Sequence, residues 1–187
     1  MNKIHFLKER EVRANINDYI GGFSKLELGI IHKYSIKPIL HLFSGNSEIG
    51  LTVDINPNSK ATIKQDVFEY IQNCKDEFNT ILMDPIYSSE SRKEIWRQKY
   101  SQLGIKKEAL YIFPYDTRRT RELWDFFIRK YPKRILIKSL SHYTIPGYDL
   151  LVGFNIYIGA FKPNRCISIY QAKNQKINQK KELSNKK

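Results

Sequence analysis

Cysteine is scarce in this sequence, and long apolar segments are absent. The 187 residues include two cysteines, Cys74 and Cys166, which are too far apart to form the paired spacing of a metal site. We therefore expect reduced, structural thiols and no bound metal. No apolar run approaches the ~20 residues that span a bilayer, and the first residues contain no signal-peptide core. These absences predict a cytoplasmic protein without a membrane partner.

Two nucleotide-binding motifs are missing as well. Residues 45–50 retain only the outer two glycines of a Gly-x-Gly-x-x-Gly fingerprint. No Gly-Lys-Ser/Thr phosphate loop occurs anywhere in the chain. The sequence therefore argues against a Rossmann dehydrogenase and against a P-loop nucleotide-binding protein.

Positive charge is abundant but unevenly placed. The formal net charge is +13, yet residues 38–87 carry seven acidic and three basic side chains. Residues 88–134 carry thirteen basic and six acidic side chains. A basic surface beside a more acidic segment is expected of a protein that binds a polyanion such as a nucleic acid. The alternative is that the lysine-rich surface serves solubility alone.

The hydrophobic pattern predicts one α/β domain, and the length allows a sizeable core. Strands are predicted at 38–43, 50–54, 80–83, 109–113, 134–140, 154–161 and 166–171. Helices are predicted at 67–74 and at 117–130, the second capped by Thr117, and residues 89–109 are predicted to form a charged helix or a helix–loop insertion. We predict a Rossmann-like, mostly parallel sheet with helices on both faces and a C-terminal antiparallel hairpin. This domain spans 38–171, with a helical N-terminal extension at 1–37 and a disordered basic tail at 172–187.

Three of these strands end in small, acidic or proline-containing residues. The three ends are Phe43-Ser44-Gly45, Asp54 and Asp84-Pro85-Ile86-Tyr87. The carboxyl ends of parallel strands lie at one edge of an open α/β sheet, where such sheets bind ligands. We therefore expect one crevice for a nucleoside-bearing cofactor and a planar substrate.

One spacing does not fit this pattern. Gly45 and Asp54 are nine positions apart, whereas the connection between parallel strands usually takes a dozen or more residues and includes a helix. Either the crossover helix is reduced to a turn, or these two strands are connected in another way.

Taken in order, these stretches resemble the class I S-adenosylmethionine-dependent methyltransferases that methylate exocyclic amino groups of nucleobases. The likeness covers about residues 38–171. The Phe-x-Gly part of the family's first motif is present, whereas His41 and Ser47 replace its acidic residue and its second glycine. Ile86 replaces the second proline of the Asp-Pro-Pro-Tyr-type substrate motif.

The resemblance implies S-adenosylmethionine as cofactor and an amino nitrogen of a base in DNA or RNA, adenine favoured, as methyl acceptor. The implied cofactor-binding residues are His41, Phe43, Ser44, Gly45, Asp54, Ile55, Asp66 and Val67, and the implied catalytic residues are Asp84, Pro85 and Tyr87. Asp54 would bind the ribose hydroxyls, and Asp66 would lie near the adenine ring. Asp84 and the Pro85 carbonyl would accept hydrogens of the amino group, and Tyr87 would stack on the base.

Several of these residues also have a purely structural interpretation. Asp66 is equally suited to cap the helix that begins at Val67. Asp54 and the Asp84-Pro85 pair could each form a turn, and His41 could be an ordinary core histidine.

Basic and aromatic residues follow the last of these motifs. Arg92, Lys93, Arg97, Arg118, Arg119 and Arg121 are predicted to contact phosphates, and Trp96 and Tyr100 are suited to stack on bases. The chain leaves little room for a target-recognition domain, so its own loops, a second copy in a homodimer or a specificity partner would select the target.

Two alternatives remain open at this point. The first is a non-catalytic nucleic-acid-binding protein on a methyltransferase-like fold, which the departures at His41, Ser47 and Ile86 favour. The second is a methyltransferase for a small molecule or a protein. Cofactor binding separates the first alternative from an enzyme, and salt-dependent nucleic-acid binding separates the second from a nucleic-acid enzyme.

Overall fold

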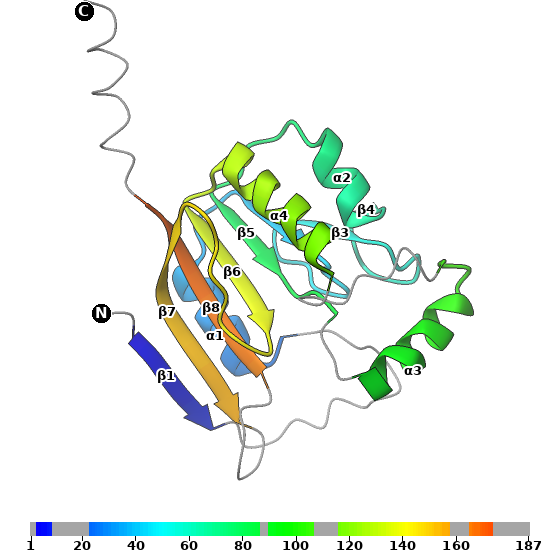
Figure 1. Cartoon of the computed structure of the whole chain (residues 1–187), viewed down its shortest axis with the longest axis horizontal. Coiled ribbons are helices and arrows are strands. Elements are labelled where there is room, and N and C mark those ends of the chain that lie inside the picture. Colours follow the sequence, from blue (N-terminus) through cyan, green and yellow to red (C-terminus); the bar gives the residue numbers. More distant parts are fainter. Residues whose placement is uncertain (1–2, 9–22, 87–89, 107–115, 158–164, 174–187) are drawn as a thin grey trace, which may run out of the picture.

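The computed structural model describes residues 3–8, 23–86, 90–106, 116–157 and 165–173, which build a β-sheet with helices packed against it (Figure 1). The strands are β1 (Lys3–Lys8), β2 (Ile39–Leu42), β3 (Leu51–Asp54), β4 (Ile63–Lys64), β5 (Thr80–Met83), β6 (Arg134–Ser139), β7 (Tyr148–Tyr157) and β8 (Arg165–Ala172). The helices are α1 (Lys25–Tyr34), α2 (Val67–Asn73), α3 (Glu90–Ser101) and α4 (Thr117–Lys130).

The eight described strands form one sheet in the order β1-β7-β8-β6-β5-β2-β3-β4. β8 pairs antiparallel with β6 and with β7, and every other pairing between described strands is parallel. The structure therefore confirms the predicted mixed α/β fold with a mostly parallel sheet and a C-terminal antiparallel hairpin.

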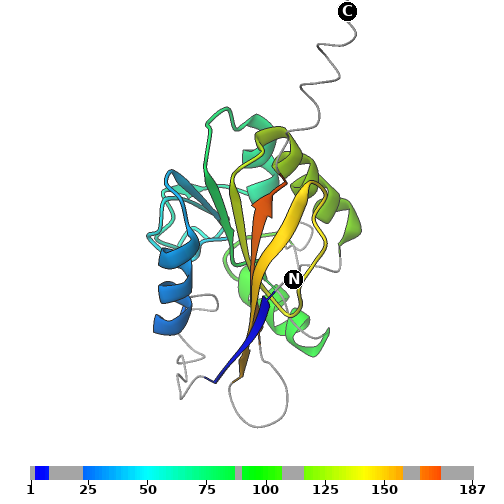
Figure 2. The ribbon, with the colours of Figure 1, turned by 90° about the vertical axis from the view of Figure 1, so that its left-hand side faces the viewer.

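Helices cover both faces of the sheet, with α1 on one side and α2 and α4 on the other (Figure 2). On the first face, Ile30 and Ile31 of α1 pack with buried side chains of the central strands, among them Leu82 and Leu136. The second face carries the larger core, to which α2 and α4 contribute Val67, Phe68, Ile71, Leu123, Phe126 and Phe127. Strands buried on both faces explain the nearly continuous apolar runs in the sequence.

The path of the chain reverses between β2 and β5. From β2 the chain moves outward through β3 to β4, and it then returns to the other side of β2 to form β5 and β6. The two connections therefore leave the carboxyl ends of β2 and β5 in opposite directions, which opens a space between them in sheets of this kind. Figure 1 shows α3 beyond this end of the sheet.

The short connection between β2 and β3 is a turn without a helix, which decides between the two predicted alternatives. β2 and β3 pair parallel through Leu40 and Leu51, with only residues 43–50 between them. Gly50 makes this path feasible, because its φ is +74° and an added Cβ would lie 2.3 Å from the backbone oxygen of Ile39. Glycine alone combines that conformation with that close approach.

We expect Gly50→Ala to lower the free energy of unfolding by more than about 2 kcal/mol. The left-handed backbone alone costs at most about 2 kcal/mol, and the close approach of the new Cβ to Ile39 adds to this cost. Gly104→Ala is the matched control, since Gly104 has a φ of +73° but no atom within 4 Å of an added Cβ. Urea denaturation of both variants measures the difference. Equal losses would show that the close approach to Ile39 contributes nothing.

The N-terminal segment departs from its predicted helical character. α1 is present, but Lys3–Lys8 is a strand that pairs parallel with β7 at the edge of the sheet. Ile4 and Phe6 alternate with Lys3 and His5, but Leu7 breaks the alternation, and the side chains of Ile4 and Phe6 are exposed. The N-terminal segment therefore contributes a strand to the main sheet, and the prediction of helices alone was wrong there.

Smaller differences concern the ends of elements. Asp116, not Thr117, caps α4, because its side chain accepts a hydrogen bond from the backbone N–H of Arg119. β4 was not predicted, since its two residues are too few to show a pattern. The predicted strand at 109–113, the last residues of the strand predicted at 154–161 and the tail from 174 lie outside the described residues. No helix in the described segments is both long and apolar enough to cross a membrane.

Candidate functional site

Asp54 ties together the backbone at the ends of β2 and β3. Its Oδ2 accepts a hydrogen bond from the N–H of Gly45 at 2.8 Å, and its Oδ1 accepts one from the N–H of Asn56 at 2.8 Å. The residue is 8% exposed. Burial raises the pKa of Asp54, and the two backbone hydrogen bonds oppose that rise. The carboxylate thus holds the loop after β2 in a fixed conformation.

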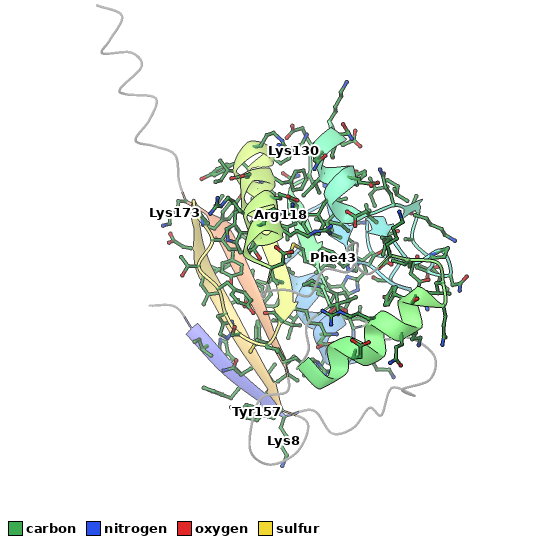
Figure 3. The ribbon with its side chains drawn as sticks, turned by 45° about the vertical axis from the view of Figure 1, so that its right-hand side comes forward. Lys8, Phe43, Arg118, Lys130, Tyr157 and Lys173 are labelled. Carbon is green, nitrogen blue, oxygen red and sulfur yellow. The ribbon has the colours of Figure 1, made fainter. Side chains whose placement is uncertain are left out.

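The loop that Asp54 holds has an unusual backbone. Phe43 has a φ of 58° and Gly45 a φ of 57°, both in the left-handed region. For phenylalanine this conformation costs about 1–2 kcal/mol, and such strain gathers at functional sites. Between them lies Ser44, whose Oγ is buried and has no hydrogen-bond partner among the described residues. Figure 3 labels Phe43 near the end of the sheet that faces α3.

Tyr100 lies close enough to Asp54 for the two groups to interact electrostatically. It stands near the end of α3 and is 7% exposed. Burial raises the pKa of Tyr100, and the charge of Asp54 raises it further. The ring is therefore packed within the protein next to the strand ends, where it is not exposed for the stacking on bases that the sequence suggested.

Asp66 caps α2, one of the two roles that the sequence left open. Its Oδ1 accepts hydrogen bonds from the N–H groups of Phe68 and Glu69, and its Oδ2 lies 3.6 Å from Nη1 of Arg119. The guanidinium of Arg119 also lies over the Phe68 ring, 4.6 Å from its centroid. Phe68 in turn packs against Phe43, which places this capping cluster beside the loop.

Asp84 follows β5 and lies beside the same loop. Its backbone N–H donates to the carbonyl of Leu42 at 3.4 Å, so it lies next to the last residue of β2. Its side chain is 5% exposed and pairs with Lys138 of β6, with 3.4 Å between Oδ2 and Nζ. Pro85 is buried directly after it. The structure therefore brings the Asp84-Pro85 pair next to the loop that Asp54 holds.

Three charged residues that the sequence did not single out accompany Asp84. Lys138 Nζ lies 3.5 Å from Oε2 of Glu27, which is fully buried at the start of α1, and Arg165 of β8 donates to Oε1 of Glu27. Two signals were present in the sequence. Lys138 interrupts the apolar run of β6, and Glu27 completes a Ser24-x-x-Glu27 capping box.

The pKa of Asp84 is raised to about 6 by this environment. Burial is the main cause, and the neighbouring charge of Glu27 adds to it. Lys138 and Arg165 oppose the shift, because a positive charge favours the carboxylate. Asp84 is therefore mostly ionised at neutral pH and titrates in a range where few carboxyl groups do.

His41 of β2 completes the buried polar groups on this face. It is fully buried, its ring packs against Phe23 with 5.5 Å between centroids, and neither ring nitrogen has a hydrogen-bond partner among the described residues. Burial lowers the pKa of His41 from 6.5 to about 3, and the charge of Lys138 contributes. The imidazole is therefore neutral at physiological pH.

We expect the His41→Leu variant to be less sensitive to acid than the wild-type protein. Because folding lowers the pKa of His41 from 6.5 to about 3, the unfolded state binds more protons between these values, and stability is lost as pH falls through them. As pH falls from 6.5 to about 3, the unfolding free energy of the wild-type protein should decrease relative to that of the variant by up to about 1.4 kcal/mol per pH unit.

The variant must be compared with the wild-type protein because the titration of Asp84 changes the stability in the opposite direction as pH falls. Its raised pKa means that the folded state binds more protons between about 4 and 6, so that Asp84 favours folding as pH falls. Urea denaturation of both proteins at intervals of about one pH unit measures the difference. Parallel curves would contradict the assigned titration of His41.

The predicted nucleic-acid residues are only partly described. Arg118 and Arg121 are exposed near the start of α4, and Arg118 is labelled in Figure 3. Arg119 is 15% exposed and engaged with Asp66, and Arg97 lies 3.5 Å from Glu94 on α3. Tyr87 and the side chains of Arg92 and Lys93 lie outside the described part of the structure.

The remaining predicted cofactor residues flank the site. Ile55 lies between the two residues joined by the Asp54–Asn56 hydrogen bond, and Val67 begins α2 with its side chain buried in the core. Within the described ranges, no three His, Cys, Asp or Glu side chains gather where they could hold a metal ion. Comparison of the sequence with models of protein families gives no match, and comparison with curated proteins gives none either.

Proposed function

We propose that this protein is an S-adenosylmethionine-dependent methyltransferase that acts on an exocyclic amino nitrogen of a base in DNA or RNA, with adenine favoured. The main observation in support is that two carboxylates, Asp54 and Asp84, lie where the order of strands along the sheet changes direction, between β2 and β5. Asp54 fixes the loop after β2, and Asp84 lies beside Leu42 at the end of the neighbouring strand. Open α/β sheets of the Rossmann-like kind bind ligands at this position.

The residues around Asp54 suit the adenosine part of the cofactor. Each carboxylate oxygen accepts one backbone N–H, and a carboxylate has about four lone-pair sites, so both oxygens can still accept a ribose hydroxyl. The left-handed Gly45 leaves its backbone uncovered by a side chain. The buried Oγ of Ser44 offers a further donor and acceptor. These features support the proposed cofactor site.

The chemistry required of Asp84 is alignment and proton acceptance. When bound, S-adenosylmethionine supplies a methyl group that moves to the amino nitrogen while the carbon–sulfur bond breaks with its electron pair on sulfur. The Asp84 carboxylate and the Pro85 carbonyl accept hydrogens of the amino group and so direct the nitrogen lone pair. The nitrogen loses one hydrogen as a proton, which Asp84 accepts. A buried position limits the competition of water for these hydrogen bonds.

The start of α4 supports a nucleic acid as the substrate. Arg118, Arg119 and Arg121 follow the Asp116 cap in the first turns of α4, and no acidic residue lies within the first turn itself. Cations near a helix N-terminus are disfavoured, each by about 0.3–1 kcal/mol, whereas an anion there is favoured. A phosphate of the substrate would pair with the exposed Arg118 and Arg121, since Arg119 is engaged with Asp66. Phe68 contacts both Arg119 and Phe43, so it connects this end of α4 to the loop after β2.

Calorimetric titration of the purified protein with S-adenosylmethionine tests the proposal. We expect saturable binding with a Kd in the micromolar range, and weaker binding of adenosine, which lacks the methionine part. A folded protein that binds neither compound would contradict the proposal. In that case a salt-dependent affinity for oligonucleotides would identify a non-catalytic nucleic-acid-binding protein.

A further inference from the structure

A chain of buried ion pairs ends at Asp84. Arg165 contacts Glu27, Glu27 lies 3.5 Å from Lys138, and Lys138 lies 3.4 Å from Oδ2 of Asp84. The four side chains are at most 16% exposed, and they come from β8, α1, β6 and the end of β5. Three secondary-structure elements thus hold one carboxylate.

Stability alone does not explain this arrangement. Desolvation of buried ions offsets most of their attraction, and apolar residues of similar volume often stabilise a core at least as well. The three residues before Lys138 in β6, Ile135 to Ile137, are apolar and fully buried, so this part of the sheet favours an apolar side chain. A charged residue that breaks the local pattern at a strand end points to a role in the site.

The role follows from the effect of Lys138 on Asp84. Burial and Glu27 both favour the protonated carboxyl, whereas Lys138 makes the largest opposing contribution. Lys138 also occupies Oδ2, and Asp84 has no other side-chain hydrogen bond among the described residues. Oδ1 is therefore the oxygen left for a ligand.

We infer that Lys138 is a positioning residue, which keeps Asp84 ionised and fixes Oδ2 so that Oδ1 accepts a hydrogen of the target amino group. Glu27, held by Arg165, keeps the Lys138 ammonium in place. This inference rests on the proposed methyltransferase function. Among the described residues, His41 of β2 is a further titratable group on this face, and its lowered pKa of about 3 keeps it neutral at physiological pH.

The test compares Glu27→Gln with the double variant Glu27→Gln/Lys138→Met. Removing Lys138 alone would leave two buried carboxylates with too little positive charge, and that variant could fail to fold. In the double variant the positive charge of Arg165 balances the negative charge of Asp84. The glutamine at position 27 preserves the capping box with Ser24. The measurements are the pH dependence of kcat for methyl transfer, the KM for oligonucleotide and the Kd for S-adenosylmethionine.

We expect the acid limb of the pH profile to lie about one pH unit or more higher in the double variant than in Glu27→Gln. At neutral pH, kcat should fall by about tenfold or more, while the Kd for S-adenosylmethionine stays within about threefold. A second double variant, Glu27→Gln/Lys138→Arg, should retain much of the kcat of Glu27→Gln, because arginine keeps the positive charge.

Two failures are distinguishable. If the wild-type protein transfers methyl groups but the double variant and Glu27→Gln have the same pH profile and kcat, the positioning role is wrong and the proposed function stands. If the wild-type protein transfers no methyl group to any oligonucleotide, the proposed function is wrong and the inference falls with it. A shift confined to the thermal unfolding midpoint, with kcat and its pH profile unchanged, would also overturn the inference.

Discussion

The Asp84→Asn variant should lose methyl transfer while it keeps its affinity for the cofactor. The amide preserves the shape of the side chain but replaces one acceptor oxygen by an NH₂ group, which cannot accept a hydrogen or a proton from the target amino group. Misalignment of reacting groups costs about 100-fold in rate, so we expect kcat to fall by at least that factor. Initial rates with labelled S-adenosylmethionine and an adenine-containing oligonucleotide measure this loss.

Asp149→Asn serves as the matched control for Asp84→Asn. It removes the same charge from an exposed carboxylate on β7 that pairs with Lys173 at the surface. Its kcat should equal that of the wild-type protein. If Asp84→Asn retained normal kcat, the amino-group mechanism would be wrong, and a parallel loss of cofactor binding would instead indicate that Asp84 supports the loop after β2.

Asp54→Asn should weaken cofactor binding by about 10- to 100-fold, which corresponds to the loss of one hydrogen bond to a charged group. In the wild-type protein both oxygens accept backbone N–H groups, from Gly45 and from Asn56. An amide would direct its NH₂ group against one of these donors and release one side of the loop. Titration calorimetry with S-adenosylmethionine measures the change in affinity.

Glu48→Gln is the control for Asp54→Asn, because it removes a carboxylate from the connection between β2 and β3, close in sequence to Asp54. Glu48 is largely exposed and pairs with Lys60 at 3.6 Å on the surface. Its loss should leave the affinity for S-adenosylmethionine unchanged within about twofold, as expected of an exposed ion pair. Equal weakening in both variants would show that the effect is one of net charge and not of the Asp54 hydrogen bonds.

Local patterns sufficed to predict most of the parallel sheet. The strand ends at Gly45, Asp54 and Asp84 were found because a buried strand is a short apolar run, and a polar residue that ends it is conspicuous. The close approach of Asp84 to Leu42 then follows from the parallel pairing of β2 with β5. The geometry at this edge of the sheet was therefore accessible from the sequence.

The buried ion pairs were not accessible in the same way. Glu27 and Arg165 are 138 positions apart, and nothing in the composition of either segment indicates their contact. Lys138 was visible as an interruption in an apolar strand, but its partners depend on which face of the sheet α1 covers. β1 was missed for a related reason, since an exposed edge strand receives its stability from its pairing with β7 and not from a buried pattern.

The account depends on methyl transfer to a base, and nucleoside analysis tests it most directly. DNA and RNA oligonucleotides are incubated with the protein and S-adenosylmethionine carrying a deuterated methyl group, digested to nucleosides and analysed by mass spectrometry. We predict a labelled nucleoside methylated on its exocyclic amino group, absent with Asp84→Asn. Unlabelled nucleic acid from a protein that binds S-adenosylmethionine would contradict the account.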